Sequence, residues 1–175
     1  MNESGQQAPL PIDGDRYRTL MSGFPTGVAV VTGLDDHGEP RGATCSALCS
    51  VTMVPPTILV CLKAGSSTLA AVRDRGWFAL NLLHARARAA AEVFSSPVAD
   101  RFAHVRWKRL GHTGLPWLVH DAFAIAECRV SELTTVSTHT VVFGQVTDAE
   151  LAEDLPDPLL YGLRRFSAWP GEGSG

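Results

Sequence analysis

Short apolar runs, most of them bounded by glycine, proline or aspartate, recur along the chain. The valine-rich run at 27–34 is typical of a strand, and the nearly continuous apolar run at 57–63 indicates a strand buried on both faces. Turn residues at 35–38 separate the first run from a strand at about 41–51 and so predict a hairpin. Further strands are predicted at 77–83, 122–134 and 138–148, the last two as an antiparallel pair.

Helical signals are fewer and shorter. Ser66 or Ser67 suits the N-cap of a helix over 66–76, and Gly76 suits the left-handed residue that ends it. Further short helices are predicted over 16–21 after Asp13 or Asp15, over 85–94, and within 157–169. Hairpins join most strands and no regular strand–helix alternation appears. We therefore predict a mainly β fold with peripheral helices, an antiparallel barrel rather than a doubly wound parallel sheet.

The composition fits one globular domain. With 175 residues, 45% of them apolar, the chain can bury a core without disulfides, and we expect one domain over 15–169 between disordered tails at 1–14 and 170–175. The net charge of −3 argues against a nucleic-acid partner, and no apolar run approaches the roughly 20 residues that span a membrane. Without a secretory signal at the polar N-terminus, we expect a cytoplasmic protein with reduced thiols at Cys45, Cys49, Cys61 and Cys128.

Several common nucleotide-binding and catalytic motifs are absent from the sequence. It contains no GxGxxG before a helix, no P-loop and no GxSxG nucleophile elbow. The six histidines are scattered, and none is spaced from another histidine or a carboxylate as helical metal ligands are, so no metal site is predicted. These absences argue against the Rossmann, P-loop and α/β-hydrolase classes.

The segment GATCSALCSVT, 42–52, is the most unusual part of the chain. Because strand side chains alternate between two faces, one face is expected to carry hydroxyls and the other small apolar groups. The hydroxyl row can be a solvated face above a crowded core. Alternatively, the small side chains let a planar ligand approach the backbone N–H and C=O groups. The first row is Thr44, Ser46, Leu48, Ser50 and Thr52, and the second is Ala43, Cys45, Ala47, Cys49 and Val51.

A second candidate feature is KAGSST, from Lys63 to Thr68, where a buried strand turns at Gly65 and enters a helix through three hydroxyl residues. A helix N-terminus offers free N–H groups and partial positive charge, so a lysine and hydroxyls beside it make a plausible phosphate cradle. The alternative is an ordinary N-cap with a surface lysine.

Two further sets of residues have open roles. His139 lies in the polar turn STHT between the two long strands, where it is either part of a site or a bystander. Arg101 and Phe102 lie in an irregular loop at 95–105 that can include a turn of helix, and they either cover a ligand or serve as a helix-end arginine and a core aromatic.

Taken together, these segments resemble the short flavin reductases that act as reductase components of two-component flavin-dependent monooxygenases. The match covers nearly all of 16–166, in order. The matching pieces are FPTGVAVVTG, GATCSALCSVTMVPP, ILVCLKAGSSTLAAV, WFALNLL, ADRF, TGLPWL, AECRV, HTVVFGQV and PLLYGLRRF. The resemblance implies an FMN-binding split β-barrel, antiparallel and Greek-key-like, that forms a homodimer. It also implies that NADH or NADPH reduces FMN or FAD, which then diffuses to a partner monooxygenase.

The resemblance also implies roles for particular residues. The positions that match contacts to the isoalloxazine ring and ribityl chain are Thr44, Cys45, Ser46, Ala47, Ser50 and Val51. Those that match the phosphate end are Lys63, Ser66, Ser67 and Thr68. His139 matches the catalytic histidine placed near nicotinamide and flavin, and Phe102 of ADRF is a further candidate flavin contact. In such a site the cofactor supplies the redox chemistry and the protein supplies position and polarity.

Two other functions fit the same barrel. One is a non-enzymatic protein that stores or carries FMN, and the other is an oxidase that keeps FMN tightly bound. Oxidation of NADH stimulated by added flavin distinguishes a reductase from both. Because no arginine cluster is evident in the sequence for a 2′-phosphate, NADH is the expected nicotinamide rather than NADPH.

Overall fold

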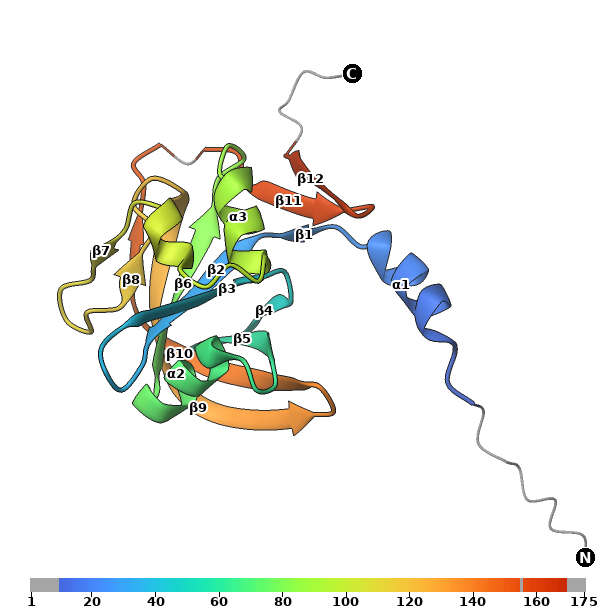
Figure 1. Ribbon diagram of the computed structural model, residues 1–175, viewed down its shortest axis with the longest axis horizontal. Coiled ribbons are helices and arrows are strands. Elements are labelled where there is room, and N and C mark those ends of the chain that lie inside the picture. Colours follow the sequence, from blue (N-terminus) through green and yellow to red (C-terminus); the bar gives the residue numbers. More distant parts are fainter. Residues whose placement is uncertain (1–9, 155, 170–175) are drawn as a thin grey trace, which may run out of the picture.

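The structure is a computed structural model that describes residues 10–154 and 156–169. A curved sheet of seven strands dominates it, and every neighbouring pair in that sheet is antiparallel (Figure 1). The predicted mainly β class is therefore confirmed. From one edge to the other the strands are β3 (Pro40–Cys45), β2 (Ala29–Leu34), β6 (Trp77–Leu83), β9 (Ala122–Val136), β10 (His139–Leu151), β5 (Pro56–Lys63) and β4 (Leu48–Met53).

The inner face of this sheet holds the main core. Inward-facing residues from five strands are completely buried: Val31, Val60, Phe78, Cys128 and Val142. Packing is tight enough that β10 needs a glycine opposite the Phe78 ring, because a Cβ on Gly144 would lie 2.5 Å from two of its ring carbons. The apolar runs of the sequence thus form strands because each of them lines this interior.

The barrel is split between β3 and β4. The sequence predicts one strand over about 41–51, but the structure breaks it at Ser46 and Ala47, so two successive strands lie at opposite edges of the sheet. The two edges approach each other there because only Ser46 and Ala47 separate β3 from β4 in the chain, and the Cys45 thiol of β3 lies 3.8 Å from the Cys61 carbonyl oxygen of β5. The prediction was wrong because strand propensity carries no signal for this change of partner.

Three short helices lie around the sheet. α1 (Gly14–Ser22) is capped by the Asp13 carboxylate, contains no buried residue and projects from the barrel beyond the end of β1 (Figure 1). α2 (Ser67–Arg75) begins after the Ser66 cap and ends at Gly76, whose φ is 70°, as predicted. α3 (Arg88–Ser95) begins three residues later than the predicted 85, and a single 3₁₀ turn, η1 (Arg101–His104), follows it.

The C-terminal stretch is a hairpin rather than the predicted short helix. β11 (Leu159–Gly162) pairs with β12 (Arg165–Ala168) and also with β1 (Thr26–Gly27). The two residues between the strands, Leu163 and Arg164, have φ of 49° and 59°, which is the left-handed geometry of a tight hairpin turn. The usual sequence signal for such a turn is Asn-Gly, so its absence explains why the hairpin was missed.

A small excursion, β7 (Lys108–Arg109) paired with β8 (Pro116–Trp117), packs on the outside of the barrel. Asn81 of β6 holds it there, because its amide nitrogen donates to the Pro116 carbonyl oxygen at 3.4 Å and its amide oxygen accepts from the Leu118 N–H at 2.9 Å. Asn81 is fully buried, so these bonds form away from water.

The expected tails fall largely outside the described residues, at 1–9 and 170–175, and remain a prediction. Residue 14 begins α1 in the structure. Within 10–154 and 156–169, no helix has the length and apolar character needed to cross a membrane.

Candidate functional site

A cavity with a volume of about 650 Å³ lies at the split of the barrel. Small residues of the β3–β4 break, Ser46 and Ala47, form part of its wall, together with Cys49 of β4 and Cys61 of β5. A mostly apolar cavity of this size suits a flat organic ligand. The remaining lining comes from α1, β1, β4, β5 and the C-terminal hairpin: Tyr17, Arg18, Met21, Ser22, Phe24, Thr26, Leu48, Leu59, Tyr161 and Arg164.

The two residues before the break turn their side chains to the protein rather than to this cavity. The Thr44 hydroxyl donates to the Ala91 carbonyl oxygen of α3 at 2.7 Å. The Cys45 thiol is in the core, 3.4 Å from the Ala47 carbonyl oxygen, and burial raises its pKa. Any ligand contact by these two residues therefore comes from their backbone.

The residues after the break lie on an open edge. Ser50 and Val51 belong to β4, which ends the sheet, and both are exposed. Neither lines the larger cavity. The expected alternation of hydroxyl and apolar rows over 42–52 is also wrong, because the break at Ser46 and Ala47 interrupts the strand and nearly all of β4 is exposed.

A smaller cavity of about 300 Å³ lies at the other end of β3. It brings Ser67, at the start of α2, together with Arg41 of β3 and Arg101 of η1. The remaining lining residues are Glu39, Pro40, Gly42, Ala99, Asp100 and Phe102. Polar side chains of both signs therefore face one small space beside a helix N-terminus.

The predicted phosphate cradle is a helix entrance, as its sequence indicates. The Ser66 hydroxyl accepts from the Leu69 N–H at 3.2 Å, and Gly65 has a φ of 76°. Thr68 is almost completely buried. Lys63 ends β5 and lines neither cavity, so of the four predicted residues only Ser67 faces the smaller cavity.

His139 begins β10, where its register partner in β5 is Lys63. Its ring is exposed, and Nδ1 lies 3.0 Å from the Thr138 hydroxyl oxygen. The structure thus places His139 beside Lys63, which is one of the predicted phosphate-end residues. His139 lies outside the lining of both cavities.

The open roles of Arg101 and Phe102 are settled in part by packing. Phe102 is 8% exposed and meets Phe94 edge-on at 5.0 Å between ring centroids, so it is a core aromatic whose edge reaches the smaller cavity. The Arg101 guanidinium donates from Nε and Nη2 to the Ser96 carbonyl oxygen and from Nη1 to that of Gly42. It therefore ties the loop after α3 to β3.

Sequence analysis missed the contribution of Arg41 to this cavity. Arg41, Ser67 and Arg101 are far apart in the chain, and they meet only because α2 and η1 both approach β3. No spacing rule relates such residues, so only the fold could reveal them.

Comparison with known proteins agrees with this architecture. The flavin reductase of Lentzea aerocolonigenes, named for NADPH, is 55% identical over 157 residues, which cover 90% of this chain and 91% of that protein. The flavin reductase of Kitasatospora aureofaciens, named for NADH, is 42% identical over 94% of this chain and 86% of its own length. The styrene monooxygenase flavin reductase of Pseudomonas putida S12 superimposes with a TM-score of 0.78 at 28% identity, covering 88% of this chain and 97% of that one. The family model described as "Flavin reductase like domain" matches residues 21–170, and the chain belongs to that family.

Proposed function

We propose that the protein is an NAD(P)H-dependent flavin reductase that supplies reduced FMN or FAD to a partner flavin-dependent monooxygenase. The larger cavity carries this proposal, because it offers about 650 Å³ of mostly apolar space against the small residues Ser46 and Ala47. Nearly all of the chain matches flavin reductases, which supports the same function. A bound flavin supplies the hydride chemistry, and the protein has to hold two planar rings in contact.

The chain offers suitable groups for the flavin ring. A flat ring can approach the backbone at the break because Ala47 and Ser46 have short side chains, and backbone N–H groups are suitable donors to a ring that gains negative charge. Leu48, Leu59 and Phe24 contribute apolar contact and keep water away from the ring. In this assignment Ser50 and Val51 lie beyond the cavity and contact the flavin from the edge of β4.

The phosphate end of the flavin is assigned to the start of α2. Ser67 faces the smaller cavity, and Ser66 and Thr68 flank it. Removing the Ser67 hydroxyl is expected to weaken FMN by roughly 10- to 150-fold and to leave riboflavin nearly unchanged, since a hydrogen bond to a charged group contributes roughly 1.5–3 kcal/mol. Fluorescence titration of Ser67→Ala with both ligands measures this. Equal weakening of the two would remove Ser67 from the phosphate contact.

His139 is proposed as the residue beside the nicotinamide. A neutral imidazole donates one hydrogen bond and accepts another without adding charge, which suits a positioning role. We expect His139→Ala to slow flavin reduction by about tenfold to a hundredfold, or roughly 1.4–2.7 kcal/mol, with little change in FMN affinity. Anaerobic stopped-flow reduction measures both quantities. A wild-type rate and nicotinamide affinity in the variant would show that His139 has no role.

A homodimer is proposed from the exposed apolar surface. Leu20 of α1 and Phe24, two residues beyond its end, are 66% and 64% exposed, and Met53 at the end of β4 and Val54 after it are 78% and 88% exposed. Because α1 buries nothing within its own chain and borders the larger cavity, a second copy related by two-fold symmetry would cover it and wall the site. Sedimentation at micromolar concentration is expected to show a dimer, and a fully active monomer would contradict this.

The preferred nicotinamide and the cellular location stay predictions. NADH was expected because no arginine cluster is evident in the sequence, but the structure brings Arg41 and Arg101 to one cavity, so that premise no longer holds. NADH and NADPH therefore have to be compared directly.

The function itself is tested by steady-state oxidation of NADH and NADPH with FMN, FAD and riboflavin as acceptors. A reductase consumes nicotinamide at a rate that rises and saturates with added flavin. A rate independent of added flavin would contradict the proposal.

A further inference from the structure

A third cavity, of about 450 Å³, lies between the end of α2 and the β7–β8 excursion. Its lining shares no residue with the larger or the smaller cavity. Leu34 of β2 and Leu115 of the excursion are buried in it, and Trp77 of β6 is half-buried beside them. The remaining lining residues are polar, and no described residue of the lining is acidic: Arg75, His112 and Thr113.

The end of α2 sets the geometry of one wall. α2 ends at Arg75, and Gly76, with a φ of 70°, turns the chain at once into β6 at Trp77. The Gly76 N–H donates to the Val72 carbonyl oxygen at 2.9 Å, and the Gly76 carbonyl oxygen accepts from the Val130 N–H at 2.9 Å. A cationic side chain and an aromatic ring therefore flank one turn that is held from both sides.

The charge of Arg75 is not neutralised by a carboxylate. Its neighbour Arg73 pairs with Asp74 at 2.9 Å, but none of the four ion pairs among the described residues includes Arg75. The negative end of a helix dipole amounts to about half an elementary charge, so it offsets the guanidinium only in part. Arg75 is therefore free to pair with an anion in the cavity.

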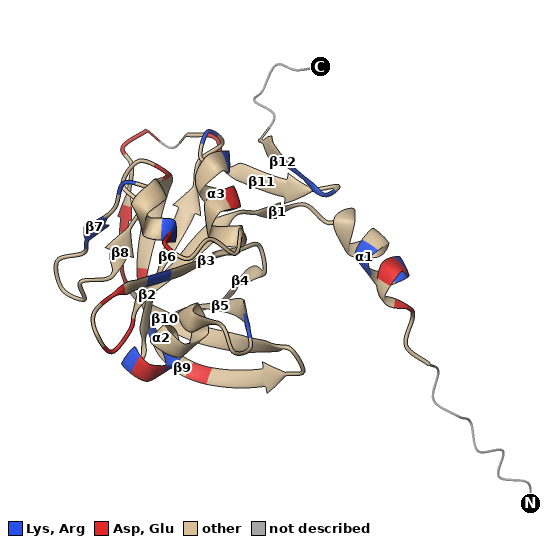
Figure 2. Ribbon diagram, viewed as in Figure 1, with Lys and Arg blue, Asp and Glu red and all other residues tan. Residues whose placement is uncertain are grey.

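The neighbouring strand β9 carries one residue of each sign on this face of the sheet. Arg129 lies opposite Trp77 in register and is exposed, whereas Glu127 lies opposite Ala79, is buried and does not line the cavity. Lys and Arg also occur at the end of α2 and along β7 (Figure 2). The charges nearest to Trp77 are therefore positive and favour an anionic ligand.

The opposite wall is the loop of the excursion, which hydrogen bonds hold in place. The Leu110 N–H donates to the Leu115 carbonyl oxygen at 2.9 Å, and the Gly114 N–H donates to that of Leu110 at 3.0 Å. The Leu115 N–H donates to the Thr113 hydroxyl oxygen at 3.3 Å. Because a hydroxyl has one hydrogen as well as two lone pairs, the Thr113 O–H can still donate to a ligand.

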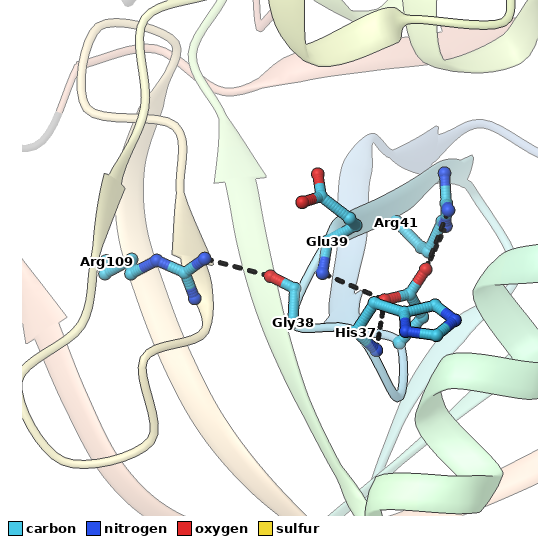
Figure 3. A network of polar contacts seen from close by, with 6 residues as sticks. His37, Gly38, Glu39, Arg41 and Arg109 are labelled. Carbon is cyan, nitrogen blue, oxygen red and sulfur yellow. Dashed lines mark hydrogen bonds and ion pairs between the residues drawn. The ribbon is translucent and has the colours of Figure 1, made fainter.

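Arg109 anchors the excursion to the β2–β3 turn, since its Nη2 donates to the Gly38 carbonyl oxygen at 2.9 Å (Figure 3). Asp35 fixes that turn, because its Oδ1 accepts from the Glu39 N–H at 2.9 Å and its Oδ2 accepts from Nη2 of Arg41 at 2.7 Å. The Glu39 N–H is the main cause that keeps the pKa of Asp35 below its usual value. Both walls of the cavity are thus fixed by the protein itself.

The combination of groups in this cavity suits one kind of ligand. An arginine binds a carboxylate through two parallel N–H···O bonds, and the face of an indole stacks on another aromatic ring. An apolar cavity of about 150 Å³ already holds benzene, so the larger volume here accommodates an aromatic ring with a short side chain. One unpaired guanidinium also matches the single charge of a carboxylate better than the double charge of a phosphate.

We propose that this cavity binds a small aromatic carboxylate, at a site separate from those of the flavin and the nicotinamide. Arg75 pairs with the carboxylate, Trp77 stacks on the ring, and the Thr113 hydroxyl donates to a carboxylate oxygen. The inference is independent of the proposed reductase function, because it uses neither of the other cavities.

The test is isothermal titration calorimetry of the full chain with phenylacetate. Phenylacetate is expected to bind at least tenfold more tightly than phenylacetamide, which lacks the charge, and more tightly than cyclohexylacetate, which lacks the aromatic face. Saturating FMN is expected to leave phenylacetate binding unchanged. Equal affinity for the acid and the amide, displacement by FMN, or equal binding of inorganic phosphate would overturn the proposal.

Two arginine variants assign the contact. Arg75→Gln is expected to weaken phenylacetate about tenfold and to leave phenylacetamide unchanged. Arg73→Gln is the matched control, because Arg73 belongs to the same turn of α2, pairs with Asp74 and does not line the cavity, so it should leave both affinities unchanged. Both side chains are exposed, and both variants are expected to keep wild-type NAD(P)H oxidation. Equal affinities for phenylacetate in the two variants would remove Arg75 from the site and overturn the proposal.

Discussion

Replacing Gly42 with alanine is expected to destabilise the protein through one identifiable clash. Gly42 lies on β3 under the aromatic pair of α3 and η1, and an added Cβ would lie 2.7 Å from Cε1 of Phe94 and 3.2 Å from Cζ of Phe102. Carbon atoms in contact normally stay about 3.5–4.0 Å apart. Both rings are buried, so neither can swing into solvent, and such overpacking costs roughly 1–3 kcal/mol.

In a chain of this size that cost corresponds to a fall in Tm of about 2–12 °C, measured by thermal unfolding followed by circular dichroism. Gly33→Ala on the neighbouring strand is the control, since its Cβ would meet other atoms no closer than 3.5 Å. The packing argument fails if Gly42→Ala is as stable as wild type, or if both variants lose stability equally.

Three further predictions concern the rest of the barrel. In the native protein a thiol reagent should label the exposed Cys49 quickly, whereas Cys128 should react only on unfolding, because burial raises its pKa to about 12. Rapid labelling of Cys128 would contradict its place in the core. Asn81→Ala should lower the free energy of unfolding, measured with denaturant, by roughly 1–3 kcal/mol, since it leaves the Leu118 N–H without its acceptor. An unchanged unfolding midpoint would count against this. The folded pKa of Asp35 is lowered, so its stabilising contribution is present above pH 3.8 and is lost as the pH falls through the folded pKa. Asp35→Asn should therefore flatten the acid limb of the plot of unfolding free energy against pH, and an identical limb would refute this.

Much of the barrel follows from local sequence, because each strand carries its own signal. The valine-rich run at 27–34 and the aspartate–glycine turn after it give the β2–β3 hairpin, and Ser66 and Gly76 mark the limits of α2. The resemblance to flavin reductases indicated residues 44–51 and 63–68 as site segments, and in the structure Ser46 and Ala47 line the larger cavity and Ser67 lines the smaller one.

The features that sequence analysis missed depend on contacts between distant segments. The local sequence is compatible with a single strand over 41–51. The strand breaks at Ser46 because β3 and β4 pair at opposite edges of the curved sheet. The turn at Leu163 and Arg164 is left-handed without glycine or asparagine, because pairing of β11 with both β1 and β12 stabilises it. Arg41 and Arg101 meet across 60 residues of sequence.

We expect the protein to reduce flavin and to release it for a second protein. The most direct test adds NADH or NADPH anaerobically to a catalytic amount of protein with a large excess of FMN. The loss of flavin absorbance measures how much FMN is reduced. We expect all of the FMN to be reduced over many turnovers, because reduced flavin leaves the larger cavity and oxidised FMN replaces it. Reduction that stops at one flavin per chain would contradict it and indicate an enzyme with tightly held FMN, and no reduction at all would indicate a carrier.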